Sequence, residues 1–345
     1  MSVSSLDAKA PTALESESQN SFYRDGKFHN ESNTTVKFEW SSILNYAKEV
    51  FKHRNIETEP KGNIPVQPLL TENILSTADD SIWRIGHSTL LIKMSGKLIL
   101  LDPVFSERAS PFQFIGPKRF HQPPITIEAL PLIDAVVISH NHYDHLDKHS
   151  IQKLSDKVKH FIVPLGNRND LIAWGVDDHK VTEMDWWQEF HINEITLVST
   201  PSQHFSGRGI NDKDKTLWSS YVIKSPDSRV FFSGDTGYFK GFKDIGEKYG
   251  PFDLTLIETG AYNPNWAAIH MLPEQSLQAH LDLKGQRMMP IHNGTFNLAL
   301  HSWKDPFEQI TKLAENHQVE LLTPEMGAPL TIKGNEKTTH WWVNL

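Results

Sequence analysis

Residues 135–147 read AVVISHNHYDHLD, an apolar run followed at once by three histidines and two aspartates. Small and β-branched apolar residues in succession are typical of a buried strand. Ionisable side chains are rare at such a strand end, so the polar run is either a solvated loop or a binding site. In an extended segment, side chains two residues apart point to the same side. His140 and His142 can therefore contact one ion.

Three further apolar runs end in a histidine or an aspartate. His204 follows TLVSTPSQ (196–203), Asp235 follows VFFSG (230–234) and His292 follows MMPI (288–291). If these strands lie side by side, their ends converge on one rim. The histidine and aspartate side chains gathered there would have the composition of a site for two divalent metals.

The composition of the chain restricts both the ligands and the partners. The 345 residues include 42 acidic and 34 basic ones, for a net charge of -8, which argues against a large groove for nucleic acid. There is no cysteine but there are 18 histidines, so a metal site must use His, Asp, Glu or water. No apolar stretch of about 18 residues and no secretory signal are found, which predicts a cytoplasmic protein.

The chain divides into three parts. Residues 1–20 read as a disordered leader, residues 21–78 as an N-terminal arm with a helix at 38–54, and residues 79–345 as the main domain. In that domain, β-rich runs flank a turn at Ser95–Gly96, and helices are expected at 148–154, 273–283 and 305–317. Strands predominate, which favours an α/β protein with a two-sheet core and helices outside.

A family resemblance rests on these motifs. SHNHYDHLD (139–147) resembles the T/S-H-x-H-x-D-H signature of the metallo-β-lactamase superfamily, and the later ligands follow in that family's order. The segments GHSTLLI (86–92), GPKRFHQPP (116–124) and IHNGTF (291–296) are similar to segments of the N-acyl-phosphatidylethanolamine-hydrolysing phospholipase D group. In addition, DGKFHN (25–30) resembles the N-terminal arm of that group. The match covers roughly residues 22–345. It implies an αββα sandwich, with two mostly antiparallel sheets flanked by helices.

The resemblance also implies two Zn²⁺ ions, with other divalent metals as an alternative. His140, His142 and His204 would hold the first ion, and Asp144, His145 and His292 the second. Asp235 would bridge them together with a hydroxide that attacks phosphorus in line. Asp144 would also orient this hydroxide, and His270 would act as an acid or contact the phosphoryl group.

Three more residues are candidates for supporting or substrate contacts. Asp102 either holds a ligand imidazole through its other N–H or is a turn residue before Pro103. His87 lies near the metals by resemblance, or is a core histidine. Arg208, between two glycines, either presents its guanidinium to a phosphate or forms a structural ion pair.

The expected function is a zinc phosphodiesterase of the phospholipase D type. It would release phosphatidic acid and an N-acylethanolamine from N-acyl-phosphatidylethanolamine-like lipids, with peripheral contact at the inner membrane surface. One alternative is a related zinc hydrolase acting on a soluble phosphodiester, cyclic phosphate or lactone. A nuclease and a di-iron electron-transfer protein are others, but di-iron members generally place Glu where this chain has His142. The family also implies a homodimer.

Overall fold

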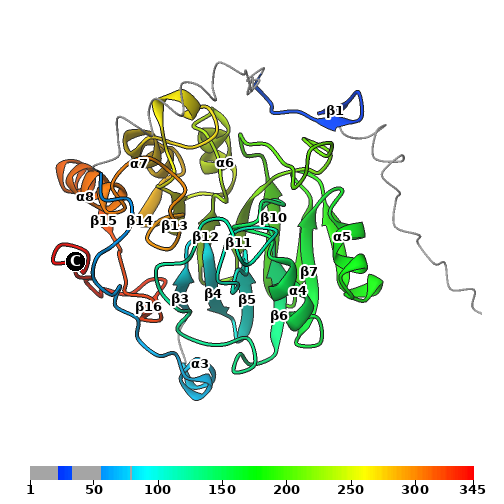
Figure 1. The fold of residues 1–345 in the computed structure, drawn as a ribbon, viewed down its shortest axis with the longest axis horizontal. Helices are drawn as coiled ribbons and strands as arrows, with labels where there is room; N and C mark the ends of the chain where they lie inside the picture. The colour runs from blue at the N-terminus through cyan, green and yellow to red at the C-terminus, as the bar shows by residue number, and fades with distance from the viewer. Residues whose placement is uncertain (1–21, 33–55, 78–79) are drawn as a thin grey trace, which may run out of the picture.

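Two β-sheets are stacked face to face with helices on both outer sides, in a computed structural model that describes residues 22–32, 56–77 and 80–345 (Figure 1). This αββα arrangement confirms the expected fold class. The leader at 1–20 and the helix expected at 38–54 lie outside the described residues. No helix within these described ranges is long and apolar enough to cross a membrane.

The first sheet has seven strands in the order β16-β3-β4-β5-β6-β7-β8. Pairing is antiparallel from β16 to β5, with the expected hairpin turn at Ser95–Gly96, and parallel from β5 to β8. The strands are β3 (Ser81–Gly86), β4 (Thr89–Met94), β5 (Lys97–Leu101), β6 (Ile133–Val137), β7 (Val158–Pro164), β8 (Val181–Met184) and β16 (Pro329–Thr331).

The second sheet also has seven strands, in the order β15-β14-β13-β12-β11-β10-β9. It is antiparallel from β9 to β12 and parallel from β12 to β15, so both sheets are mixed. The strands are β9 (Glu189–Ile192), β10 (Ile195–Thr200), β11 (Ser220–Lys224), β12 (Arg229–Phe232), β13 (Phe252–Glu258), β14 (Gly285–Ile291) and β15 (Glu320–Leu321).

The apolar runs of the sequence are continuous because the strands are buried on both faces. In β6, Ala135 and Val137 face the core between the sheets, where they join Leu197 of β10 and Leu256 of β13. Val136 points to the other side, into the layer under the helices.

Helices cover each outer face. The first sheet is covered by α3 (Thr71–Ser76), α4 (Lys148–Leu154) and α5 (Arg168–Ala173), and the second by α6 (Gly241–Tyr249), α7 (Pro273–Asp282) and α8 (Asp305–His317). Two 3₁₀ turns, η1 (Asp178–Lys180) and η2 (Pro264–Trp266), lie in connections. The predicted bounds of α4 and α8 are confirmed, and α7 ends one residue earlier than predicted.

A separate N-terminal hairpin lies on top of this sandwich (Figure 1). It consists of β1 (Tyr23–Arg24) and β2 (Lys27–Phe28). Phe28 is buried in a cluster with Trp186, Leu217 and Trp218, so the start of the described chain packs against segments far away in sequence.

Candidate metal centre

The ends of four strands bring the seven proposed ligands together. His140, His142, Asp144 and His145 lie in the loop after β6, while His204, Asp235 and His292 follow β10, β12 and β14. Their ligand atoms fall into adjoining groups of the kind that could hold a metal ion. One group is His140, His142, His204 and Asp235, which we call the first cluster, and another is His87, Asp144, His145 and His292. Because Asp235 also contacts His145 and His292, we call Asp144, His145, His292 and Asp235 the second cluster.

The first cluster presents three imidazole nitrogens to one point. His142 Nδ1 lies 2.8 Å from His140 Nε2 and 3.2 Å from His204 Nε2. Asp235 Oδ2 is 3.9 Å from His140 Nε2 and 3.8 Å from His204 Nε2. The far nitrogens are already occupied, because His140 Nδ1 contacts Ser139 Oγ and His204 Nδ1 contacts the carbonyl of Ile269.

The second cluster combines two imidazoles with two carboxylates. Asp144 Oδ2 lies 3.4 Å from His145 Nε2 and 3.2 Å from His292 Nε2. Asp235 reaches the same histidines, with Oδ1 3.1 Å from His145 Nε2 and Oδ2 3.1 Å from His292 Nε2. Asp235 is therefore the residue shared by both clusters.

This arrangement fits a pair of divalent cations. Four ligands around a tetrahedral ion, with bonds of about 2.0–2.2 Å, lie roughly 3.3–3.6 Å apart. Most of the separations in both clusters are close to that value. In addition, His145 Nε2 and Asp235 Oδ1 are buried, and neither makes a hydrogen bond to a described residue. Buried polar atoms without partners are costly, and a cation between them would satisfy both.

The two clusters differ in charge. Burial lowers the pKa of His142 to about 4 and holds those of His140 and His204 well below normal, which favours neutral rings that could bind a cation. Burial also acts to lower the pKa of His292, but the charge of Asp235 and hydrogen bonds with Asp144 and Asp235 raise it to about 10. The two carboxylates thus favour a positive charge at this point, which a bound cation would supply in place of a proton.

Asp102 contacts the ring nitrogen of His145 that faces away from the second cluster. Its buried carboxylate lies 2.7 Å from His145 Nδ1 and accepts hydrogen bonds from Ser139 N at 2.7 Å and from Ser139 Oγ at 2.6 Å. His145 can therefore donate Nδ1–H to Asp102 and turn Nε2 towards the second cluster, as histidine ligands commonly do. This geometry matches the supporting role considered for Asp102 rather than a simple turn.

His87 lies beside the second cluster. Its Nε2 is 3.1 Å from Asp144 Oδ2, and burial, followed by the charge of His292, lowers its pKa to about 3. A neutral imidazole there can orient Asp144. His87, Asp102 and His292 all have positive φ angles, of 54°, 38° and 64°. Left-handed backbone at non-glycine residues stores strain of about 1–3 kcal/mol each and tends to cluster at functional sites.

Arg208 contacts the loop after β6 rather than an open site. Its Nη1 donates to the carbonyls of Asn141 at 2.7 Å and Leu146 at 2.6 Å, and the guanidinium lies 4.1 Å from the centre of the Tyr143 ring. These contacts support a structural role, although the partners are carbonyls and a ring, not the carboxylate of an ion pair.

Two glycines permit the close approach of the loops. At Gly234, with φ of 55°, a Cβ would lie 2.6 Å from Ser139 Cβ. At Gly260, a Cβ would lie 2.0 Å from the carbonyl oxygen of His292. A larger residue at Gly234 would push the Asp235 segment away from Ser139, and one at Gly260 would push the segment after β13 away from His292.

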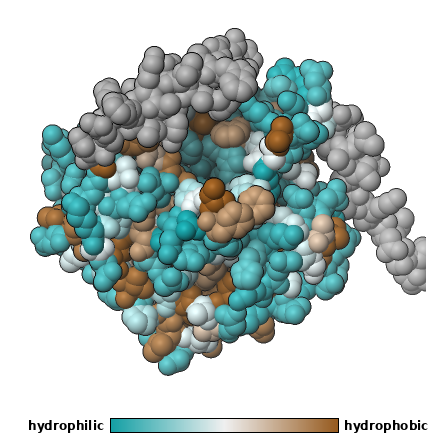
Figure 2. Space-filling model, viewed as in Figure 1, coloured by the Kyte–Doolittle hydropathy of each residue, from teal (hydrophilic) through white to brown (hydrophobic). Residues whose placement is uncertain are grey.

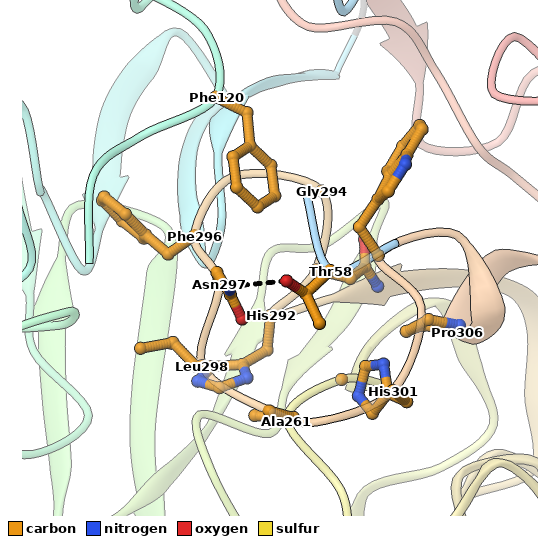
Figure 3. A pocket seen from close by; sticks show the side chains of 14 residues that line it. Thr58, Phe120, Ala261, His292, Gly294, Phe296, Asn297, Leu298, His301 and Pro306 are labelled. Carbon is orange, nitrogen blue, oxygen red and sulfur yellow. Dashed lines mark hydrogen bonds between the residues drawn. The ribbon is translucent and has the colours of Figure 1, made fainter. Parts of the chain in front are cut away.

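A small cavity lies beside His292 (Figure 3). Phe120, Phe296 and Leu298 form its apolar side, and Asn297 Nδ2 donates to Thr58 Oγ1 at 3.0 Å across it. The cavity borders the second cluster but contributes no further ligand to it. The loop after β14 therefore forms one wall of this cavity, next to the second cluster.

Sequence reasoning missed Asn30 as a supporting residue. Its Oδ1 accepts from His204 N at 3.1 Å and from Trp218 Nε1 at 2.9 Å, and its Nδ2 donates to the carbonyl of His204 at 2.9 Å. The amide thus holds the backbone of a proposed ligand on both sides. The signal was the DGKFHN motif, but nothing local to it indicates a partner 174 residues away.

Replacing Asn30 by alanine is expected to weaken metal binding, because His204 loses both backbone contacts. We expect a metal affinity lower by about 10-fold and a stability lower by about 1–3 kcal/mol. Competition with a chelator and thermal unfolding measure the two effects. His29→Ala, at the neighbouring half-buried residue, serves as the control. Unchanged metal affinity in Asn30→Ala would refute this role.

The fold and the paired His/Asp clusters define a metallo-β-lactamase-type protein of the metal-dependent hydrolase class. A family model described as the beta-lactamase superfamily domain matches residues 97–293. The chain therefore belongs to the β-lactamase superfamily.

Relatives extend this similarity to most of the chain. An uncharacterized protein of Mycobacterium tuberculosis is 40% identical, over 97% of this chain and 90% of its own length. N-acyl-phosphatidylethanolamine-hydrolyzing phospholipase D 1 of Caenorhabditis elegans is 32% identical, over 88% of this chain and 92% of its own. A solved metallo hydrolase from Ignicoccus hospitalis shares the fold, with a TM-score of 0.57 and 23% identity over 73% of this chain and 98% of its own.

Proposed function

We propose that this protein is a binuclear zinc phosphodiesterase of the phospholipase D type. Its substrates would be N-acyl-phosphatidylethanolamine-like phospholipids, and its products phosphatidic acid and an N-acylethanolamine. The observation that carries the proposal is the pair of clusters joined by Asp235. The lipid class is supported by the name of the C. elegans relative, at 32% identity.

The chemistry is the hydrolysis of one P–O bond. Two divalent ions, when bound, would supply an activated water and balance charge on the phosphoryl oxygens. The water oxygen bonds to phosphorus, the bond to the alcohol oxygen breaks, and a proton from the water ends on that leaving oxygen. Asp144, which contacts His87, would orient the attacking water.

His270 is proposed to contact the phosphoryl group or the leaving oxygen. Its ring centre lies 5.1 Å from that of His204 in the first cluster and 5.4 Å from that of His292 in the second. Its side chain is 16% exposed, so it faces both the clusters and the solvent. A phosphoryl group held between the clusters would be within its reach.

Zinc is proposed because of the ligand types. The described clusters contain imidazoles and aspartates, and His142 stands at the position where di-iron relatives generally carry Glu. Three imidazoles with one carboxylate suit zinc. Iron as the main metal in the purified protein, measured by emission spectroscopy, would contradict this part of the proposal.

An apolar loop tip supports a lipid substrate. Phe112, Phe114 and Ile115 are 56%, 80% and 59% exposed, in the connection between β5 and β6. The base of this connection packs through Val104 and Ala109 on Phe296, which lines the cavity beside His292. Figure 2 shows apolar side chains protruding next to a hollow on this face. We propose that the tip enters the membrane surface.

Replacing Phe112 and Phe114 together by serine is expected to reduce hydrolysis of N-acyl-phosphatidylethanolamine in vesicles by about 10-fold or more, because most of the exposed apolar tip is lost. Activity on a soluble diester should change less than twofold. Vesicle sedimentation and kinetics on both substrates measure this. The control is Leu132→Ser, at an exposed residue before β6. An equal loss on both substrates would contradict membrane contact.

The substrate itself is tested with zinc-loaded protein. We expect turnover of N-acyl-phosphatidylethanolamine vesicles and of bis-p-nitrophenyl phosphate, with both activities lost on chelation and restored by zinc. Turnover of soluble diesters, cyclic phosphates or lactones alone would favour the soluble-substrate hydrolase. No turnover of any diester would refute the phosphodiesterase. Sedimentation of the protein in the same buffer measures its mass in solution and so tests the homodimer that the family resemblance implies.

A further inference from the structure

A buried carboxylate that the chemistry above does not use lies at the end of β13. Glu258 has no solvent exposure. Its Oε1 is hydrogen-bonded to His270 Nδ1, and its Oε2 accepts the backbone N–H of Thr236 at 2.7 Å. Burial of a carboxylate without compensation is costly, so such a group is retained where its contacts serve a purpose.

The backbone around Glu258 is firmly held. Its N–H donates to Ser233 Oγ at 2.9 Å, and its carbonyl accepts from Ser276 Oγ of α7 at 2.7 Å. Thr236, which binds the carboxylate, directly follows Asp235. The Glu258 carboxylate therefore connects the segment after β12, which carries Asp235, to the ring of His270.

The contact engages one of the two ring nitrogens of His270. His270 Nδ1 shares a hydrogen with the Glu258 carboxyl group, and Nε2 lies on the opposite side of the ring. Within the described part of the chain, the ring makes no other hydrogen bond. An imidazole whose Nδ1–H is held by a carboxylate has a fixed tautomer and orientation.

We propose that Glu258 is the positioning residue of His270: it accepts Nδ1–H and holds the ring beside the two clusters, which leaves Nε2 available to a bound group. The catalytic part of this inference rests on the proposed function, whereas the positioning itself does not. Asp235, Glu258, His270 and His292 also form a group that could hold a metal ion. Both oxygens of Glu258 already have protein partners, namely His270 Nδ1 and the N–H of Thr236, which favours positioning over metal binding.

Glu258→Gln tests this role with little change in volume. A glutamine has one acceptor oxygen for the two donors, so either Thr236 N–H or His270 Nδ1–H loses its partner. We expect kcat/KM for the diester to fall by about 10- to 100-fold, with two metal ions per chain retained. Ser276→Ala is the matched control, because it removes a hydrogen bond to Glu258 but leaves the carboxylate in place.

A double-mutant cycle separates positioning from general structural damage. If Glu258 acts through His270, then Glu258→Gln should add less than about a twofold loss in a His270→Ala background. An equal loss in both backgrounds, or loss of a metal ion in Glu258→Gln, would overturn the inference.

The second measurement does not depend on activity. Nitrogen-15 NMR of histidine side chains, with the His270 signals assigned by their absence in His270→Ala, reports which ring nitrogen carries the proton. We expect Nδ1 to be protonated in the wild type and in Ser276→Ala, and this state to be lost or mixed in Glu258→Gln. An unchanged tautomer in Glu258→Gln would overturn the inference. If the wild-type protein cleaved no diester, the proposed function would fail while this measurement still decided the positioning role.

Discussion

Asp235→Ala is expected to abolish binding of both metal ions and to lower diester hydrolysis by about a thousandfold or more. The reason is that Asp235 alone contributes to both clusters, with oxygens 3.1 Å from His145 Nε2 and from His292 Nε2. Its removal takes away the one carboxylate that contacts both of these buried rings and also belongs to the first cluster. Emission spectroscopy and steady-state kinetics measure the two effects.

His142→Ala gives the matched comparison for Asp235. His142 belongs to the first cluster only, so this variant should lose one ion per chain and keep the other. Asp227→Ala, at an exposed turn, controls for loss of an acidic charge. Two ions per chain in Asp235→Ala, or activity within tenfold of the wild type, would show that Asp235 does not join the clusters.

Asp102→Ala is expected to have the next largest effect. The substitution leaves the Ser139 N–H buried without an acceptor and leaves His145 Nδ1 with only Ser139 Oγ at 3.4 Å, and each such loss costs about 1–3 kcal/mol. Because His145 also loses its fixed orientation, metal affinity should fall by about 10- to 100-fold. Thermal unfolding of the metal-free protein measures the first effect, and chelator competition the second.

Asp102→Asn separates the two contributions. Its amide oxygen can still accept from Ser139, but its NH₂ group is a donor and cannot accept from His145 Nδ1–H. We expect stability nearer to the wild type, with metal affinity still reduced. Equal metal affinity in the wild type and both variants would contradict the supporting role of Asp102.

The parts of the site that were predictable are those encoded in short segments. The loop after β6 holds four proposed ligands within six residues, and the apolar runs before His204, Asp235 and His292 mark strand ends. The helices α4 and α8 were also predictable, because their apolar positions repeat at helical spacing. Helix α6 was not predicted, since GFKDIGEKY contains two glycines and is stabilised by burial of Phe242 and Ile245 under the sheet.

The sequence by itself determined the fold class and the ligand types, because strand burial and metal preference depend on residue type and local spacing. Tertiary structure decided which groups orient those ligands. Asn30 meets His204 and Glu258 meets His270 only after the sheets have formed, and neither position is distinguished by its neighbours in the chain. A hydrogen bond has no sequence pattern of its own when its donor and acceptor come from different strands and loops, so these contacts are visible only in the folded protein.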